Sequence, residues 1–241
     1  MNLKFLLPAL IAGLCIASPV LSQNLQMHYD MGEDRGYLTS TIEMFKPDKW
    51  GSTFYFVDFD YDPSAGESVS LAYMEIARGL RFWETPFEIH VEYNGGFGQF
   101  PSEPFNEAYP IHDAWLFGGH YTWSNEDFSR NFTLQAMYKN IRSKHDASFQ
   151  ITGVWNLHFA DQRFSFTGFA DFWKEDFEFE EFHGGGIPDL IETHYVFLAE
   201  PQIWYNLTPH FSLGSEVELA SNFGGHRGFK VCPTLAAKWN F

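Results

Sequence analysis

The sequence predicts an all-β fold, a single transmembrane antiparallel β-barrel of about twelve strands that follows an N-terminal signal peptide. Three observations predict it: many segments alternate apolar and polar residues, short and long connections alternate along the chain, and one face of the last segment stays apolar up to Phe241. Aromatic residues make up 19% of the 241 residues, yet mean hydropathy is −0.25. Such a composition suits a wall that is apolar on one side and polar on the other.

The first 22 residues have the pattern of a secretory signal peptide. Lys4 precedes an apolar stretch that contains Pro8, and Val20 and Ser22 fit the small-residue rule for cleavage before Gln23. A membrane anchor helix would need a longer run, and a lipoprotein leader would need a small residue before Cys15. We therefore expect two parts, a signal peptide over 1–22 and an outer-membrane β-barrel domain over 23–241.

Period-2 alternation defines the expected strands. In "PFEIHVEYNGG", for example, Phe87, Ile89 and Val91 share one face, and Glu88 and His90 share the other. The same pattern recurs in "SFQITGVWNLHF", "RFSFTGFADFW" and "FSLGSEVELA". The expected strands lie near 25–31, 36–46, 51–61, 69–82, 86–95, 112–124, 129–140, 148–159, 163–175, 192–206, 210–220 and 228–241.

The connections between these segments carry a second signal. Those after even-numbered strands are short, whereas those after odd-numbered strands include the long loops 96–111 and 176–191. Short turns at one end and long loops at the other are typical of outer-membrane barrels, with the short turns on the periplasmic side.

The last segment, "FKVCPTLAAKWNF", alternates to its final residue. In a closed barrel the last strand pairs with the first, so we expect its apolar face to meet lipid and Trp239 and Phe241 to lie at the aromatic girdle. Pro233 lacks a ladder donor, which predicts a bulge or a position near a loop. The alternative is a soluble sandwich or lipocalin-like barrel with these aromatics around one core.

Charge and cysteine content exclude several functions. The chain has 15 basic and 31 acidic residues, and the expected leader contributes only Lys4, so a mature net charge of −17 follows. Such a chain does not bind nucleic acid through its phosphates. Only Cys232 remains after the leader, so no intrachain disulfide is possible.

Several stretches together, "EMFKPDKWGSTFYFVDFDYD", "SLAYMEIARGLRFW", "PFEIHVEYNGG", "GFADFW" and "EPQIWYNL", resemble a poorly characterised outer-membrane β-barrel family of Gram-negative anaerobes. That family is itself similar to the Tsx-type nucleoside-specific channels. The resemblance implies a twelve-stranded porin-like channel for nucleosides, with aromatic and ionisable residues lining a narrow lumen.

The alternation places rings, carboxylates and amides on the inward face. Bases stack on rings and ribose hydroxyls donate to carboxylates, so this lining suits a flat, neutral, hydroxylated solute. The alternative is that these groups form a hydrogen-bonded plug or hydrate the lumen. The expected substrate-binding and lumen residues are Phe54, Phe56, Asp58, Tyr73, Glu75, Arg81, His90, Glu92, Phe169, Asp171, Trp173, Glu200, Gln202 and Trp204.

We expect no catalytic residue, cofactor or metal site. Glu88, His90 and Glu92 share a face and could chelate a metal, but such a set more often forms a polar network. Twelve-stranded phospholipases carry a His-x-Ser pair with an Asn, and this chain has His210, Ser212 and Asn206. In the expected barrel, His210 lies in a short periplasmic turn and Ser212 faces the lumen, which does not suit chemistry on outer-leaflet lipid.

The expected location is the cell outer membrane, and the expected partners follow from it. They are outer-membrane lipid, a small nucleoside-like solute, and the barrel-assembly machinery through the C-terminal Phe241. The function alternatives that remain are a lipid-modifying enzyme and a closed structural or binding barrel.

Overall fold

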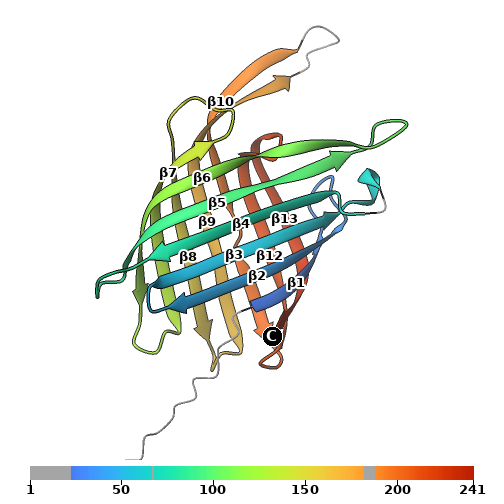
Figure 1. The fold of residues 1–241 in the computed structure, drawn as a ribbon. Helices are drawn as coiled ribbons and strands as arrows, with labels where there is room; N and C mark the ends of the chain where they lie inside the picture. Colours follow the sequence, from blue (N-terminus) through green and yellow to red (C-terminus); the bar gives the residue numbers. More distant parts are fainter. Residues whose placement is uncertain (1–22, 67, 182–187) are drawn as a thin grey trace, which may run out of the picture.

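The computed structural model describes residues 23–66, 68–181 and 188–241, and the expected signal peptide over 1–22 lies outside these residues. A single antiparallel sheet closes on itself because β1 pairs with β13 (Figure 1). The strands of the described residues are β1 (Gln23–Asp30), β2 (Leu38–Asp48), β3 (Gly51–Tyr61), β4 (Leu71–Leu80), β5 (Phe87–Phe100), β6 (Glu107–Ser124), β7 (Arg130–Ile141), β8 (Ser148–Phe159), β9 (Phe164–Glu181), β10 (Asp189–Ala199), β11 (Gln202–Asn206), β12 (Phe211–Phe223) and β13 (His226–Asn240). A 3-10 turn, η1 (Pro63–Ala65), follows β3.

The barrel wall has twelve strands, because β10 and β11 lie end to end between β9 and β12. The fold class is therefore the one that the sequence predicts. The expected strand 192–206 is interrupted at Glu200 and Pro201. At this break the Glu200 N–H donates to the Phe169 carbonyl, and the Val217 N–H donates to the Pro201 carbonyl.

Two expected loops are largely strands. β5 extends to Phe100 and β6 begins at Glu107. In the same way, β9 extends to Glu181 and β10 begins at Asp189. The regions 96–111 and 176–191 are therefore mostly β-hairpins that project beyond the barrel (Figure 1). We call this end of the barrel the hairpin end and the opposite end, which holds the short connections, the turn end.

Pro233 lies in the middle of β13 without a bulge, so the expectation of a bulge or a loop position was wrong. Pro233 stands opposite Val217, and the β12–β13 register shifts only between Ser221 and Phe223. The Glu216 N–H donates to the Thr234 side-chain oxygen at 3.0 Å instead of to a backbone carbonyl. Side-chain and neighbouring-strand acceptors thus replace part of the ladder around the proline.

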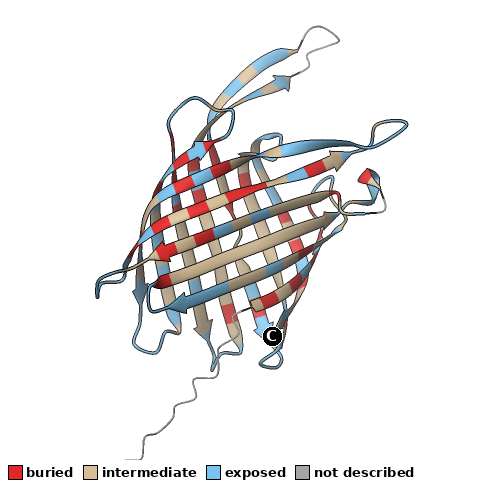
Figure 2. Ribbon diagram, viewed as in Figure 1, coloured by how far each residue is buried: buried red, intermediate tan, exposed pale blue. Residues whose placement is uncertain are grey.

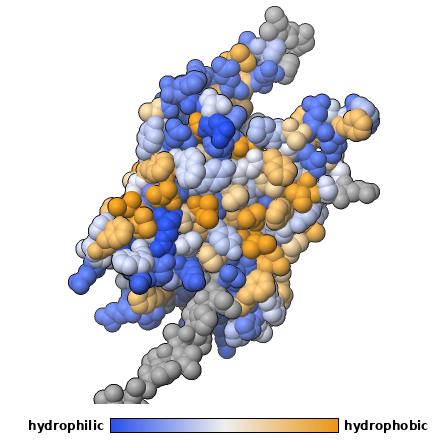
Figure 3. Space-filling model, viewed as in Figure 1, coloured by the Kyte–Doolittle hydropathy of each residue, from blue (hydrophilic) through white to orange (hydrophobic). Residues whose placement is uncertain are grey.

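The outer face of the barrel is apolar. Large side chains exposed on it include Ile42, Ile89, Phe117, Ile151 and Leu213. Figure 2 shows exposed and buried residues alternating along the strands, and Figure 3 shows hydrophobic residues over the middle of the visible wall. No helix within the described residues is long and apolar enough to cross a membrane.

Aromatic rings gather at the turn end. Trp83 stacks on Phe87, and Phe159 stacks on Phe164, with ring centroids 5.8 and 5.5 Å apart. Trp239 stacks on His210 next to the last strand. An outward-facing ring of aromatics at this level corresponds to the interfacial girdle of membrane barrels.

Candidate functional site: the barrel lumen

The inward face of the barrel is polar, and its accessibility differs from strand to strand. The inward side chains of β1 and β5 are buried, namely Asn24, Gln26, His28, Asp30, Glu88, His90, Glu92 and Asn94. Those of β2 and β3 are only half-buried, namely Thr39, Thr41, Glu43, Phe54, Phe56, Asp58 and Asp60. The inward side chains of β2 and β3 are therefore more accessible than those of β1 and β5.

An aromatic row runs along this accessible wall. The ring centroids of Phe54 and Phe56 lie 6.0 Å apart, and those of Phe56 and Tyr73 also lie 6.0 Å apart. The Tyr73 hydroxyl donates to Glu75 at 2.8 Å, and Asp58 stands opposite Tyr73 in the β3–β4 pair. Three rings and two carboxylates thus share one face of two neighbouring strands.

Threonine hydroxyls of β2 donate hydrogen bonds to the carboxylates of β3. Thr41 donates to Asp58 at 2.5 Å, and Thr39 donates to Asp60 at 2.6 Å. An ionised carboxylate has about four acceptor sites, so each keeps capacity for a further donor.

A second group lies at the centre of the lumen. Glu75, Glu92 and Asp171 come from three strands and lie within electrostatic range of one another and of Lys139. The Lys139 ammonium lies 4.2 Å from the centroid of the Trp173 ring. Trp173 is 6% exposed, so this ring is occupied by protein and presents little surface to a solute.

A third group surrounds Trp204. The Trp204 indole N–H donates to the Gln202 side-chain oxygen at 2.9 Å, and the Gln202 amide donates to Glu216 at 2.6 Å. The Lys238 ammonium lies 4.0 Å from the Trp204 ring centroid. Glu200, released inward by the strand break, lies within electrostatic range of Glu216. This group is closed by its own contacts, since Trp204 is 0% exposed.

Two expected lumen residues stand apart from these groups. Arg81 lies just after β4 at the turn end, within electrostatic range of Glu88. Phe169 stands opposite Val154 in the β8–β9 pair.

A chain of hydrogen-bonded side chains includes residues that the sequence reasoning did not single out. His90 and His120 face each other with their Nδ1 atoms 3.1 Å apart. The Nε2 of His90 lies 2.9 Å from Glu92, and that of His120 lies 3.3 Å from Glu88. Glu88, His90 and Glu92 thus form part of a polar network, and its missing member was His120. The alternation of the expected strand 112–124 places His120 inward, but only the register of β5 and β6 pairs it with His90.

Arg35 makes another contact that the sequence did not reveal. Its guanidinium donates to Asp30 at 2.7 Å and to Glu218 at 2.8 Å. These two ion pairs join the β1–β2 connection to the inward face of β12 at the hairpin end.

The residues proposed for lipid hydrolysis do not form a catalytic pair. The His210 Nδ1 lies 2.9 Å from the Asn240 carbonyl, and its ring stacks on Trp239. Ser212 is fully buried and donates to Asn206 at 2.7 Å. A nucleophile needs a base within hydrogen-bond reach, and here the two groups bond to other partners.

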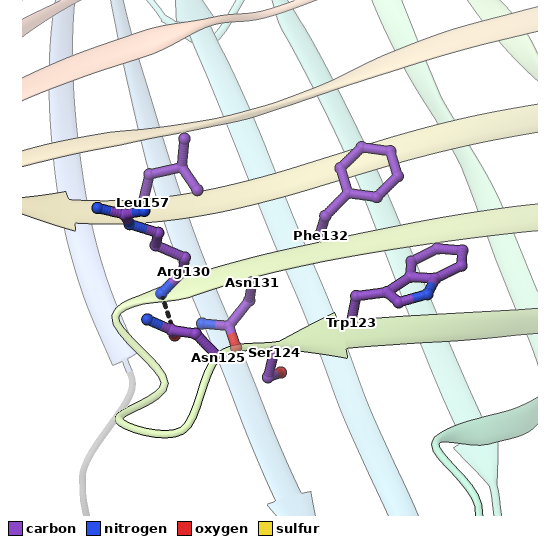
Figure 4. A pocket seen from close by; sticks show the side chains of 7 residues that line it. All are labelled: Trp123, Ser124, Asn125, Arg130, Asn131, Phe132 and Leu157. Carbon is purple, nitrogen blue, oxygen red and sulfur yellow. Dashed lines mark hydrogen bonds between the residues drawn. The ribbon is translucent and has the colours of Figure 1, made fainter.

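A pocket of about 210 Å³ lies at the turn end, between β6, β7 and β8 (Figure 4). Trp123, Phe132 and Leu157 line it together with polar residues of the β6–β7 turn. These three side chains belong to the outward face, so the pocket is separate from the lumen.

A protein family described as a domain of unknown function (DUF5020) matches residues 22–241. The chain belongs to this family. No curated protein matches the sequence.

Solved structures that are similar to this DUF5020 barrel include outer-membrane channels. The KdgM porin is 9% identical, with a TM-score of 0.47 and coverage of 91% of this chain and 98% of that chain. Omp33 of Acinetobacter baumannii is 15% identical, with a TM-score of 0.43 and coverage of 91% and 96%. The channel DcaP of Acinetobacter baumannii is 9% identical, with a TM-score of 0.35 and coverage of 91% and 95%.

At these identities the likeness concerns architecture alone. The protein is a twelve-stranded barrel of the outer-membrane type, and its apolar outer wall places it in the cell outer membrane in contact with lipid. The resemblance to Tsx-type channels and the expected roles of the fourteen lumen residues stay predictions.

Proposed function

We propose that this protein is a channel for the passive diffusion of small, flat, hydroxylated solutes that are neutral or cationic, with nucleosides first. The observation that carries the proposal is the aromatic row of Phe54, Phe56 and Tyr73 beside Asp58 and Glu75, on the accessible wall of the lumen.

The chemistry of this row fits both the base and the ribose of a nucleoside. The base offers a π face for a ring of the row, and the ribose offers hydroxyl donors for carboxylates. Trp173 and Trp204 are covered by Lys139 and Lys238. We therefore assign stacking on the solute to the rings of the β3–β4 row. The two tryptophans hold the side chains of the lumen wall in place. Anionic solutes, such as nucleotides, are repelled by the carboxylates.

Uptake of labelled nucleosides into liposomes that contain the purified protein tests the proposal. Stacking on an aromatic ring contributes about 1–3 kcal/mol, so Phe56→Leu should weaken solute binding by about fivefold to a hundredfold. Phe59→Leu is the matched control, because Phe59 lies three residues further along β3 and faces outward. A disaccharide of similar mass measures passage without stacking.

We expect saturable nucleoside uptake that exceeds disaccharide uptake and that falls in Phe56→Leu only. Equal rates for the two solutes in the wild type would leave only a general pore. Absence of flux of both solutes would identify a closed barrel. A loss of equal size in both variants would contradict the role of the row.

A lipid-modifying enzyme is the less favoured function, because His210 and Ser212 are not bonded to each other. We expect purified protein with His210→Ala or Ser212→Ala to show the same lipid hydrolysis as the wild type.

A further inference from the structure

The hairpin formed by β9 and β10 carries a group of side chains outside the lumen. β8 begins at Ser148, and its pairing with β9 reaches Trp173. From Lys174 onward β9 pairs only with β10, so this part of the hairpin rises above the barrel wall (Figure 1). Long loops of outer-membrane barrels lie on the extracellular side.

Among the described residues, Asp176, Glu192 and His194 are the one set of three side chains whose ligand atoms all lie within 4.8 Å of one another. The His194 Nδ1 lies 2.7 Å from Asp176 Oδ1 and 4.0 Å from Glu192 Oε1. A tetrahedral ion with bonds of about 2.0–2.1 Å holds its ligand atoms about 3.3 Å apart. The observed distances bracket that value, so small side-chain rotations bring the three atoms onto one ion.

A register shift of the two strands lies next to this group. Thr193 stands opposite Phe177 but Tyr195 stands opposite Lys174, so Glu175 and Asp176 together oppose His194. Such a bulge re-aims a side chain. In the register of Thr193 and Phe177 the next pair is His194 and Asp176, so these two side chains lie on one face of the hairpin.

A cavity of about 420 Å³ adjoins the group. Its lining includes Asp176 and Glu192 and, from the β7–β8 connection, His145 and Asp146. Asp146 lies within interaction range of Asp176.

The neighbouring cations do not occupy the position between these ligands. Lys144 donates to the backbone carbonyl of Asp176 and lies 4.0 Å from Glu175. Its ammonium also lies 4.7 Å from the Phe177 ring centroid. Lys174 also lines the cavity and lies within electrostatic range of Asp176, but no ion pair joins it to His194 or Glu192 among the described residues. The ligand atoms of His194 and Glu192 are therefore free of a lysine partner.

We propose that His194 Nδ1 and one carboxylate oxygen each of Asp176 and Glu192 form a binding site for a divalent first-row transition metal ion, with Asp146 as a fourth ligand. One imidazole with carboxylates suits Zn²⁺ and Mn²⁺. The site lies outside the lumen and does not depend on the proposed transport function.

Isothermal titration of the full, tag-free protein in detergent with ZnCl₂ or MnCl₂ tests the site. Excess Mg²⁺ in the buffer suppresses weak binding to surface carboxylates. We expect one ion per chain for the wild type, and a loss of affinity of at least about tenfold for His194→Ala and for Asp176→Asn, because even residues that only orient metal ligands contribute tenfold or more. His210→Ala is the control, since His210 is exposed at the turn end.

Heat-dependent gel mobility verifies that each variant is folded. The site is supported if either metal binds the wild type and binds more weakly to His194→Ala and Asp176→Asn but not to His210→Ala. Absence of binding by the folded wild type, or equal affinity in all variants, would overturn it and leave His194 and Asp176 as an ordinary ion pair.

Discussion

At the residue scale, alternation determines which side chains face the lumen. None of the fourteen expected lumen residues is among the exposed side chains. The period of a strand assigns each residue to a face without knowledge of its neighbours. Alternation does not predict which side chain of another strand each inward residue contacts. The contacts of His90 with His120, of Lys139 with Trp173 and of Arg35 with Glu218 depend on strand register and on the curvature of the wall.

The assignment of faces can be tested on one strand with one introduced side chain. Ile151 is 39% exposed on the outer wall between Ala136 and Phe172, whereas Val154 faces inward between Thr133 and Phe169. Ile151→Lys should destabilise the barrel by about 2–4 kcal/mol, because it places a charge in lipid near the midplane. Val154→Lys should have a much smaller effect.

Folding into lipid vesicles followed by urea titration measures both changes. A larger loss of stability for Val154→Lys than for Ile151→Lys would show that the faces are inverted.

At the element scale, the sequence predicts where strands occur better than where they end or break. The projecting hairpins were expected as loops because residues 96–111 and 176–191 contain several Gly, Pro and acidic residues, which are typical of turns. Pairing between the two arms of each hairpin overrides that tendency. The break at Glu200 and Pro201 depends on the neighbouring strand, where Gly168 has a φ of +142°.

Gly168 should be essential for the broken strand. A Cβ at this position would lie 2.3 Å from the Glu200 carbonyl oxygen, and its backbone conformation is one that side chains rarely adopt. Gly168→Ala should destabilise the barrel by more than about 1 kcal/mol. Gly153→Ala is the matched control on β8, because the nearest atom to its Cβ is 3.7 Å away.

The urea midpoint of each variant in vesicles provides the comparison. Unchanged stability of Gly168→Ala would mean that the strand break is not held by this close approach.

At the scale of the whole molecule, the lumen carries many more carboxylates than basic groups. Inward-facing Asp and Glu occur on β1, β2, β3, β4, β5, β9 and β12 and at the break after β10, whereas inward lysines of the described wall strands, such as Lys139 and Lys238, are fewer. The fold class and the membrane location follow from composition and period alone. The unequal accessibility of the inward side chains does not follow from composition and period, because it depends on which side chains pair across the interior.

This excess of acids should make any ionic current through the protein cation-selective. In a planar bilayer with a KCl gradient, the reversal potential should have the sign of K⁺ permeation, and Asp58→Asn combined with Glu75→Gln should bring it closer to zero. High salt should also reduce it, because salt screens exposed charges. A reversal potential of the opposite sign would contradict the proposed role of the acidic wall.

The closure between β1 and β13 also determines the order in which the molecule can be made. His28 bonds to Thr234, 206 positions further along the chain, and the Phe241 N–H donates to the Gln23 carbonyl. β1 is synthesised long before β13, so the barrel cannot close until the final strand is present. Contacts between the two ends of the chain span the whole sequence, and contacts of this range slow folding.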